Sequence, residues 1–433
     1  MPQRTRTDAL SDRHAMRTTT PNDTSEDLLT TTDPDASPRD GIFPAQLLRE
    51  AVRRGWVSSG EYRITDEALQ PASLDLRLGD VALALRCSFL PGAQTSVAER
   101  ARDLAFDEID ITKGGTLERD RPYLVELREE LKLPRAYRAK TNPKSSTGRL
   151  DVFTRVITDR NDRFDEIAPG YHGKLYLEIV PRTFAIRVRS GMSLNQLRLV
   201  SGRARVTDGE LRHIHAESPL LYLGKKPLPE SQLNTADGLF LRLALAGGAD
   251  QVVGYRARKH SLPIDLSVIH KYNWREFWDP VHPEPGGRIV LEPELFYLLL
   301  SYEGVRIPPD YAAEMTAYDP TAGELRTHYA GFFDPGFGHD PRGRRHGSRA
   351  ALEVRARDVA FMVEHLQPVC KLAFERMIAT PDVLYGEALG SNYQGQESML
   401  SKHFTEQTAG VAQMALRDPA TTLGMHAPRV ARS

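Results

Sequence analysis

A short loop and one glutamate carry the side chains best suited to chemistry in this chain. Residues 144–149 read Lys-Ser-Ser-Thr-Gly-Arg, and Glu178 follows inside an apolar stretch. Small residues let backbone amides approach an anion closely, while the hydroxyls and the two cations, Lys144 and Arg149, supply donors for phosphate oxygens. The loop therefore predicts a site for an anionic ligand such as a triphosphate. An ordinary turn with solvated charges has the same composition and stays an alternative.

Glu178 occupies the face of its segment opposite three aliphatic residues, Leu175, Leu177 and Ile179. Such a carboxylate is a plain surface residue if that face meets solvent. If it meets an enclosed pocket, burial raises its pKa and lets it accept and return protons near neutral pH. The sequence thus offers Glu178 as a group that deprotonates a water molecule and later delivers protons to a leaving group.

The chain contains an internal repeat, in which residues 175 positions apart match. The matched pairs are Pro134 and Pro309, Gly148 and Gly323, Leu150 and Leu325, Glu178 and Glu353, and Leu197 and Leu372. The two loops differ in charge, because Asp319 and Glu324 stand where the first loop has its cations. We therefore expect an anionic ligand to use only the first loop. Glu353 is interpreted as a relic or a structural residue, since an acidic loop beside it would repel a nucleotide.

Apolar alternation predicts that both halves are rich in strands. The alternating segments are 74–78, 175–179 and 186–188 in the first half, and 239–243, 352–354 and 359–363 in the second. A helical spacing of apolar residues predicts one short helix from Leu47 to Gly55. The expected fold class is all-β, with a few short helices.

Local composition suggests how the chain is divided. Residues 1–40 lack apolar periodicity and are expected to form a disordered leader. A proline-rich stretch at 227–231 favours a boundary between domains at 41–220 and 221–380. Residues 381–410 are expected to form a segment that closes over the site, followed by a tail at 411–433.

Composition also restricts the partners. The formal net charge is −1, so no global field attracts nucleic acid or anionic lipid, and a small-molecule partner is expected. The hydrophobic content of 40% is sufficient for two buried cores. The sequence shows neither an apolar run of about 18 residues nor the apolar region of a signal peptide. We therefore expect a cytoplasmic protein that binds neither nucleic acid nor membrane.

One motif suggests zinc chemistry but is incomplete. His215-Ala216-Glu217 matches the His-x-Glu of zinc nucleobase deaminases, which also need a Pro-Cys-x-x-Cys segment. Neither Cys87 nor Cys370 provides it. A zinc site is therefore not expected, and His213 and His215 are predicted on a surface strand or linker.

Five motifs in order resemble the dCTP deaminases of the dUTPase-like superfamily, in their longer two-domain bacterial form. The motifs lie at 70–79, 144–149, 158–178, 191–197 and 393–404, and the resemblance spans residues 41–404. It implies two duplicated dUTPase-like domains of the β-clip or distorted jelly-roll type.

The resemblance implies hydrolytic deamination of dCTP to dUTP and ammonia, without protein-bound zinc. Glu178 would activate water for attack at cytosine C4, and Ser145 and Arg149 would position the water and stabilise developing charge. Mg²⁺ would arrive with the triphosphate. The residues expected to contact the substrate are Lys144, Ser146, Thr158, Asp162, Tyr171, Gln196, Tyr393, Gln394, Gln396 and Lys402. Among these, Asp162 and Gln196 would contact the deoxyribose, and the last four would form a lid.

Two departures from the family pattern bear on the site. Lys144 replaces the usual arginine. The substitution keeps the positive charge but loses the two parallel hydrogen bonds that a guanidinium can donate to a phosphate. Ala168 replaces the aspartate that usually precedes Pro-Gly, whereas the second half keeps Asp334 before Pro335-Gly336. Family members place their sites between subunits, so we expect a homo-oligomer with composite sites and regard dTTP as a candidate inhibitor.

Two alternatives to deamination alone stay open. The first is hydrolysis of dUTP to release pyrophosphate, either alone or in a bifunctional enzyme. The second is a non-enzymatic regulator that binds deoxynucleoside triphosphates.

Overall fold

The computed structural model describes residues 39–317, 325–327, 331–339, 346–356, 358–386 and 399–405, and these are mainly strands, as predicted. The first half contains β1 (Gly41–Ile42), α2 (Ala45–Arg53), β2 (Val57–Ser58), η1 (Asp66–Ala68), β3 (Leu74–Leu85), α3 (Val97–Leu104), β4 (Ala105–Asp110), β5 (Gly115–Leu117), β6 (Tyr123–Lys132), β7 (Tyr137–Pro143), α4 (Ser145–Gly148), β8 (Val152–Ile157), β9 (Glu166–Ile167), β10 (His172–Pro181), β11 (Ile186–Val188) and β12 (Ser193–Ser201).

The second half continues with elements of the same kind. It contains α5 (Asp208–Glu217), β13 (Leu221–Leu223), β14 (Lys226–Pro227), η2 (Glu230–Gln232), β15 (Leu239–Arg242), β16 (Gly254–Ala257), β17 (Ile264–Asp265), η3 (Trp274–Glu276), β18 (Trp278–Val281), β19 (Arg288–Leu291), β20 (Phe296–Val305), β21 (Tyr311–Ala317), β22 (Leu325–Thr327), β23 (Phe332–Phe333), β24 (Ser348–Ala356), β25 (Phe361–Glu364) and β26 (Pro368–Arg376).

The strand pairings repeat along with the sequence. In the first half β10 lies between β6 and β8, and in the second half β24 pairs with β20 and β22. Likewise β12 lies between β3 and β7, and β26 lies between β15 and β21. The internal repeat is therefore a repeat of structure, and Glu178 on β10 and Glu353 on β24 occupy equivalent strands.

Apolar periodicity explains most elements. Leu175, Leu177 and Ile179 of β10 are buried in the main hydrophobic core, as their alternation predicted. Helix α2 buries Leu47 and Leu48 and confirms the predicted short helix.

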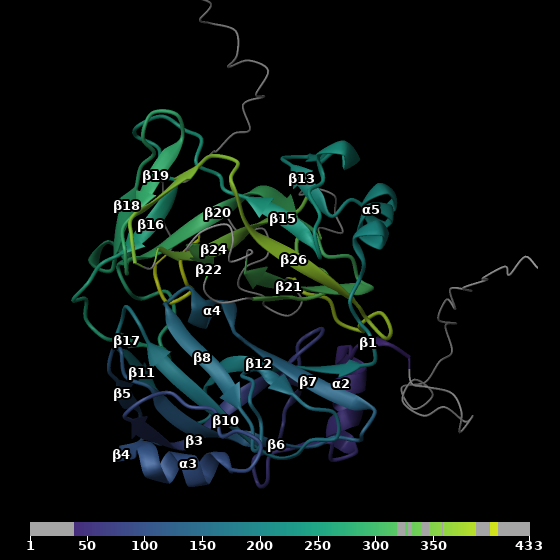
Figure 1. Cartoon of the computed structure of the whole chain (residues 1–433), viewed down its shortest axis with the longest axis vertical. Helices are drawn as coiled ribbons and strands as arrows, with labels where there is room; N and C mark the ends of the chain where they lie inside the picture. Colours follow the sequence, from purple (N-terminus) through teal and green to yellow (C-terminus); the bar gives the residue numbers. More distant parts are fainter. Residues whose placement is uncertain are drawn as a thin grey trace, which may run out of the picture.

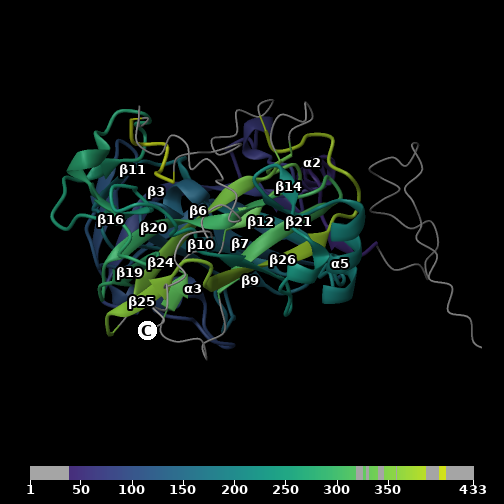
Figure 2. The ribbon, with the colours of Figure 1, turned by 90° about the horizontal axis from the view of Figure 1, so that it is seen from above.

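Figures 1 and 2 show α2 and α5 on one side of the molecule, with β19 on the opposite side.

Helices α3 and α5 were not predicted, although the sequence carries their start signals. Each begins with a capping box, Ser96 with Glu99 in α3 and Thr207 with Glu210 in α5. His213 and His215 therefore lie on a helix, and the predicted surface strand or linker was wrong. Among the described residues, no helix has the length and apolar character needed to cross a membrane.

The largest hydrophobic core contains residues of both halves, and the halves meet at α4. The largest cluster of buried apolar residues combines first-half side chains such as Phe184 with second-half side chains such as Trp278, whose rings lie 5.5 Å apart. Strand β17 of the second half pairs in parallel with β11 of the first. Figure 1 shows the halves stacked, with α4 at their contact.

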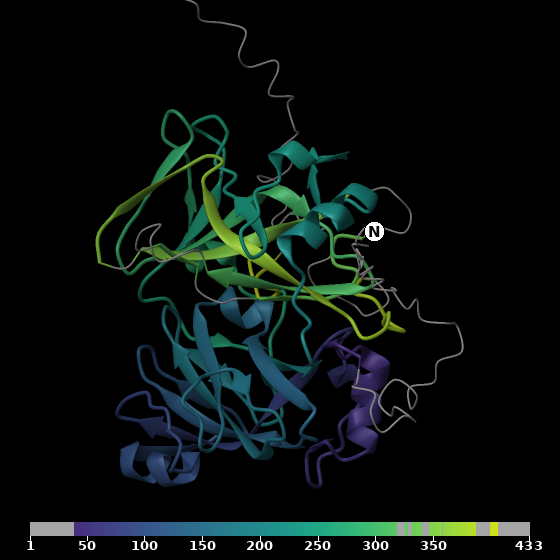
Figure 3. The same ribbon diagram turned by 45° about the vertical axis from the view of Figure 1, so that its right-hand side comes forward.

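Partly buried ion pairs and backbone hydrogen bonds also join the halves. Lys140 Nζ on β7 lies 2.6 Å from a carboxylate oxygen of Glu314 and 2.7 Å from one of Glu375. After β26 the chain returns to the first half, where the amide of Ile378 donates to the carbonyl of Ile42 at 3.0 Å. Figure 3 shows this yellow-green segment passing beside the purple α2 region. The contact between the halves is thus an extensive, bonded interface.

Candidate active site

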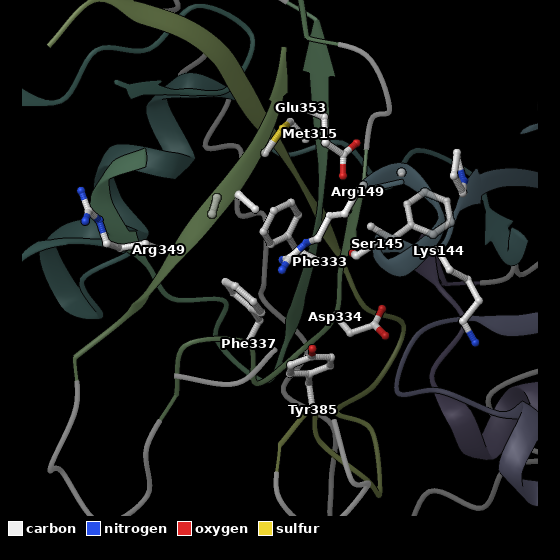
Figure 4. Close-up of a pocket in the computed structure, with 16 residues that line it drawn as sticks. Lys144, Ser145, Arg149, Met315, Phe333, Asp334, Phe337, Arg349, Glu353 and Tyr385 are labelled. Carbon is white, nitrogen blue, oxygen red and sulfur yellow. The ribbon is translucent and has the colours of Figure 1, made fainter. Parts of the chain in front are cut away.

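A pocket lies where α4 of the first half faces the sheet of the second half (Figure 4). It has about 630 Å³ of empty volume, part of which is open to solvent. The lining residues are Pro143, Lys144, Ser145, Gly148 and Arg149 from the first half, and Met315, Gly331, Phe332, Phe333, Asp334, Phe337, Arg349, Ala350, Ala351, Glu353 and Tyr385 from the second. The predicted cationic loop therefore does line a pocket, and both halves build it.

Glu353 projects from β24 against the end of the loop. A methyl group on Gly148 would lie 2.5 Å from Glu353 Oε2, so the missing side chain at Gly148 is what lets the carboxylate approach the loop. Glu353 is buried, and its Oε2 has no hydrogen-bond partner among the described residues. Burial raises the pKa of the Glu353 carboxyl well above its ordinary value; Arg149 opposes this effect and Asp151 adds to it.

Arg149 follows α4 directly and is itself buried. Its guanidinium donates to the carbonyls of Met399 and Leu400 at 3.5 and 3.4 Å. Figure 4 shows the side chain extending across the pocket, with Glu353 on one side and Asp334 on the other. Arg149 thus places a positive charge close enough to the Glu353 carboxyl to oppose the rise of its pKa.

Ser145 opens α4 and faces the second half across Gly331. A methyl group on Gly331 would lie 4.0 Å from Ser145 Oγ, which is ordinary van der Waals contact. The helical turn is closed by backbone bonds, among them Gly148 N to Lys144 O at 3.1 Å. The turn therefore presents Ser145 and Arg149 to the same pocket.

A second carboxylate, Asp334, lies in the turn after β23 and accepts a hydrogen bond from Arg198 at 2.8 Å. Burial raises the pKa of Asp334, and the Arg198 guanidinium opposes the increase. Phe333 and Phe337 flank this turn, and their rings lie 5.0 Å apart edge to face. The second half thus supplies an aromatic, partly polar wall opposite the loop.

The C-terminal segment 399–405 packs on the loop within the same chain. Ser401 Oγ donates to the carbonyl of Ser146 at 3.0 Å. Lys144 forms an ion pair with Asp75. Burial lowers the pKa of Lys402, Lys144 lowers it further, and Asp75 acts in the opposite sense. Lys402 therefore adds a cation next to Lys144. Tyr393, Gln394 and Gln396 lie outside the described residues.

Glu178 is not brought together with the loop inside the chain. It is fully buried, and Arg155 Nε donates to its Oε1 at 3.0 Å, while the Arg155 guanidinium lies 3.6 Å from the ring centre of Phe164. Glu178 does not line the loop pocket. The carboxylate beside the loop is Glu353, which the sequence analysis interpreted as a relic or a structural residue. The reason is that Gly148, at the end of α4, meets Glu353 on β24 of the other half.

The remaining predicted contacts divide into two groups. Thr158 is buried and accepts from Asn161 Nδ2 at 3.0 Å, Asp162 is exposed, and the Tyr171 hydroxyl donates to the carbonyl of Lys174 at 2.7 Å. None of the three lines the loop pocket. Gln196, by contrast, lies at the start of the loop, because its Nε2 donates to the carbonyl of Pro143 at 3.4 Å.

Sequence reasoning missed the second-half lining, namely Phe333, Asp334, Phe337 and Glu353. The sequence did contain a signal for it, because the Asp-Pro-Gly turn typical of the family is intact at Asp334 and altered at Ala168. The turn that lines the pocket is the intact one.

The His-x-Glu motif does not form a metal site in the described part of the chain. His215 is buried in α5, where its Nε2 lies 2.7 Å from the carbonyl of Leu228 and its Nδ1 accepts from the amide of Leu220 at 3.2 Å. No group of three or more His, Cys, Asp or Glu side chains in the described ranges is placed to bind a metal ion. Both ring nitrogens of His215 are thus occupied by backbone groups.

Comparison with known proteins identifies the family. Residues 39–203 match the family model of the 2′-deoxycytidine 5′-triphosphate deaminase N-terminal domain, and residues 207–404 match that of its C-terminal domain. No curated protein matches. A crystal structure of 2′-deoxycytidine 5′-triphosphate deaminase from Agrobacterium tumefaciens is 42% identical, with a TM-score of 0.74, over 79% of this chain and 100% of that one. The dUTPase from phage phi11 of S. aureus is 13% identical, with a TM-score of 0.20, over 35% of this chain and 92% of that one. Matched over both halves, the chain belongs to the 2′-deoxycytidine 5′-triphosphate deaminase family.

Proposed function

We propose that this protein deaminates dCTP hydrolytically to dUTP and ammonia in the pocket between its two halves. Family membership supports the substrate and the reaction. The observation that carries the proposal is the position of Glu353, a buried carboxyl beside both Gly148 and Arg149 of the cationic loop.

In this mechanism Glu353 moves two protons. Its carboxylate takes a proton from water as the water oxygen bonds to C4, and it passes that proton to N3. It then takes the hydroxyl proton of the tetrahedral intermediate and gives it to the amino group, so that the C4–N bond breaks and ammonia leaves. A carboxyl whose pKa lies above its ordinary value is suited to both accepting and returning a proton near neutral pH.

Arg149 and Ser145 stabilise charge in this scheme. The Arg149 guanidinium favours the ionised form of Glu353, which the reaction needs at its start. Ser145 lies on the same turn and would donate or accept a hydrogen bond at the attacking water. These groups act from a buried pocket, where electrostatic interactions are stronger than in water. We therefore propose a reaction that uses no protein-bound zinc.

The triphosphate would lie toward Lys144, Ser146 and Lys402, where two cations gather next to the loop. Mg²⁺ would enter as part of the substrate. Gln196, at the start of the loop, would contact the deoxyribose, and Tyr393, Gln394 and Gln396 would cover the phosphates. Because dTTP carries the same triphosphate, we retain it as a candidate inhibitor. We also retain the homo-oligomer, but with a pocket lined by the two halves of one chain in place of composite sites between chains.

We further propose one catalytic site per chain. Glu178, the equivalent of Glu353, already bonds to Arg155, whereas the residue equivalent to Arg155 in the second half is Ala330. The loop of the second half has acids at both positions where Lys144 and Arg149 stand. The equivalent site thus combines an ion-paired carboxylate with an acidic loop.

The test is incubation of the purified protein with dCTP, CTP and dUTP in the presence of Mg²⁺, with ammonia and pyrophosphate measured separately. Ammonia from dCTP supports the proposal. Pyrophosphate from dUTP without ammonia would favour a pyrophosphatase, and both products would indicate a bifunctional enzyme. Nucleotide binding without any product would favour a regulator and refute the proposal.

A further inference from the structure

Arg355 leaves β24 two residues after Glu353, so both side chains project from the same face of the strand toward the first half. Both are buried. Glu353 meets the loop at Gly148, and Arg355 forms an ion pair with Asp151, two residues after the end of the loop. A second donor of Arg355 reaches the carbonyl of Glu294 in its own half. Arg355 therefore links the strand that carries Glu353 to the segment that carries Arg149.

Asp151, like Arg355, is buried and makes several hydrogen bonds. Its side chain is almost fully buried and accepts from Thr183 Oγ1 at 2.5 Å. Its amide donates to the carbonyl of Gly148 at 2.8 Å, and its φ of 57° is uncommon for a residue other than glycine. Asp151 thus joins Arg355 directly to the backbone of Gly148.

The Asp151–Arg355 ion pair has no equivalent at the matching positions of the internal repeat. The position equivalent to Asp151 is Arg326, and the position equivalent to Arg355 is Val180. By contrast, the ion pair between Arg77 and Glu129 in the first half has a counterpart between Arg242 and Glu303 in the second. The Asp151–Arg355 pair accompanies only the half-to-half contact that carries the cationic loop.

We propose that Asp151 and Arg355 are positioning residues for deamination: their ion pair keeps residues 148–151 in register with β24, so that Glu353 stays against Gly148 and beside Arg149. The inference rests on the proposed function for its kinetic consequence. Neither side chain lies among the groups proposed to touch the substrate. Loss of the pair displaces the proton-carrying group relative to the loop, and a displacement of about 1 Å can cost up to about 100-fold in rate.

The experiment uses the full-length enzyme and three variants, Asp151→Asn, Arg355→Gln and the double variant. Each single variant is expected to lower kcat for dCTP about tenfold or more, with KM changed less than about twofold, because the carboxyl moves while the phosphate contacts stay. The double variant should be no slower than the slower single variant, because all three break the same contact. Hydrogen exchange at the Asp151 amide should become faster in all three.

Arg77→Lys is the matched control. It disturbs the partly buried Arg77–Glu129 ion pair, which has a counterpart in the second half and lies away from the pocket. It should lower thermal stability and leave both kcat and the rate of hydrogen exchange at the Asp151 amide unchanged. Arg355→Lys replaces Arg355→Gln if circular dichroism shows that the latter does not fold. Wild-type kcat, or wild-type exchange at the loop, in the single variants would overturn the inference. If the unmodified protein releases no ammonia from dCTP, the proposed function fails, and the exchange measurement alone then decides whether the pair holds the loop.

Discussion

Replacing each of the two equivalent glutamates by glutamine tests which of them performs the chemistry. Glu353→Gln keeps the volume beside Gly148 but removes the group that exchanges protons. General acid–base catalysis contributes about 10²- to 10⁴-fold, and Glu353 acts in two transfers, so kcat should fall by about 10³-fold or more. KM for dCTP should change less than about threefold, because the phosphate contacts are retained.

The same substitution has a stability effect of predictable sign. The pKa of Glu353 is raised in the folded protein, so its contribution to stability is present below about pH 4.5 and is lost as the pH rises through the folded pKa. Glutamine carries no charge at any pH. Glu353→Gln should therefore unfold at the same temperature as the unmodified protein, or a higher one, at neutral pH.

Glu178→Gln should behave in the opposite way. Breaking a buried ion pair costs about 3–5 kcal/mol, but the Arg155 side chain is 23% exposed and regains water, so we expect about 1–3 kcal/mol. The midpoint of thermal unfolding should fall by several degrees, while kcat of the folded enzyme is unchanged.

Ammonia release at neutral pH and thermal melts of both variants provide the assay. Activity should be lost in Glu353→Gln, and stability should be lost in Glu178→Gln. Loss of turnover in Glu178→Gln together with normal turnover in Glu353→Gln would refute the assignment of the site to the contact between α4 and β24.

Three further changes follow from the same geometry. Arg149→Glu, which copies the acid of the second loop, should lower kcat at least about 100-fold in the ammonia assay, because a like charge then faces Glu353; full activity would contradict the loop assignment. Ser401→Ala removes the bond to the carbonyl of Ser146 and should raise KM about 2- to 10-fold with little change in kcat, and an unchanged KM would count against a role for the C-terminal segment. In a pH series, the acid limb of kcat should lie above pH 4.5, because burial raises the pKa of Glu353 and protonation stops the first transfer; a limb at or below that value would argue against Glu353.

Sequence patterns predicted the elements of this fold well, because periodicity reports local burial. The alternation in β10 and its counterpart in β24 identified both strands, and the helical spacing from Leu47 identified α2. Helices α3 and α5 were missed because their apolar stripes are short, and only their capping boxes distinguish them from loops.

The glutamate that lies beside the loop was harder to predict. A sequence repeat identifies equivalent positions but does not show which surfaces of the two halves contact each other. Glu178 and Glu353 are equivalent in sequence, and choosing between them needs the packing of one half on the other. The local charges held part of the answer. Arg155 stands on the strand next to Glu178 and bonds to it, whereas the second half has Ala330 at that position. The intact turn at Asp334 pointed the same way.

The placement of α4 and β24 on one polypeptide has a consequence for how the enzyme responds to dilution. Groups that meet across separate subunits come apart when copies become scarce, whereas groups tethered in one chain keep the same effective concentration at any protein level. The apposition of Arg149 with Glu353 needs no encounter between molecules. Specific activity should therefore be retained when the protein is diluted to nanomolar concentrations. A catalytic site formed between separate subunits would lose activity as the subunits dissociate.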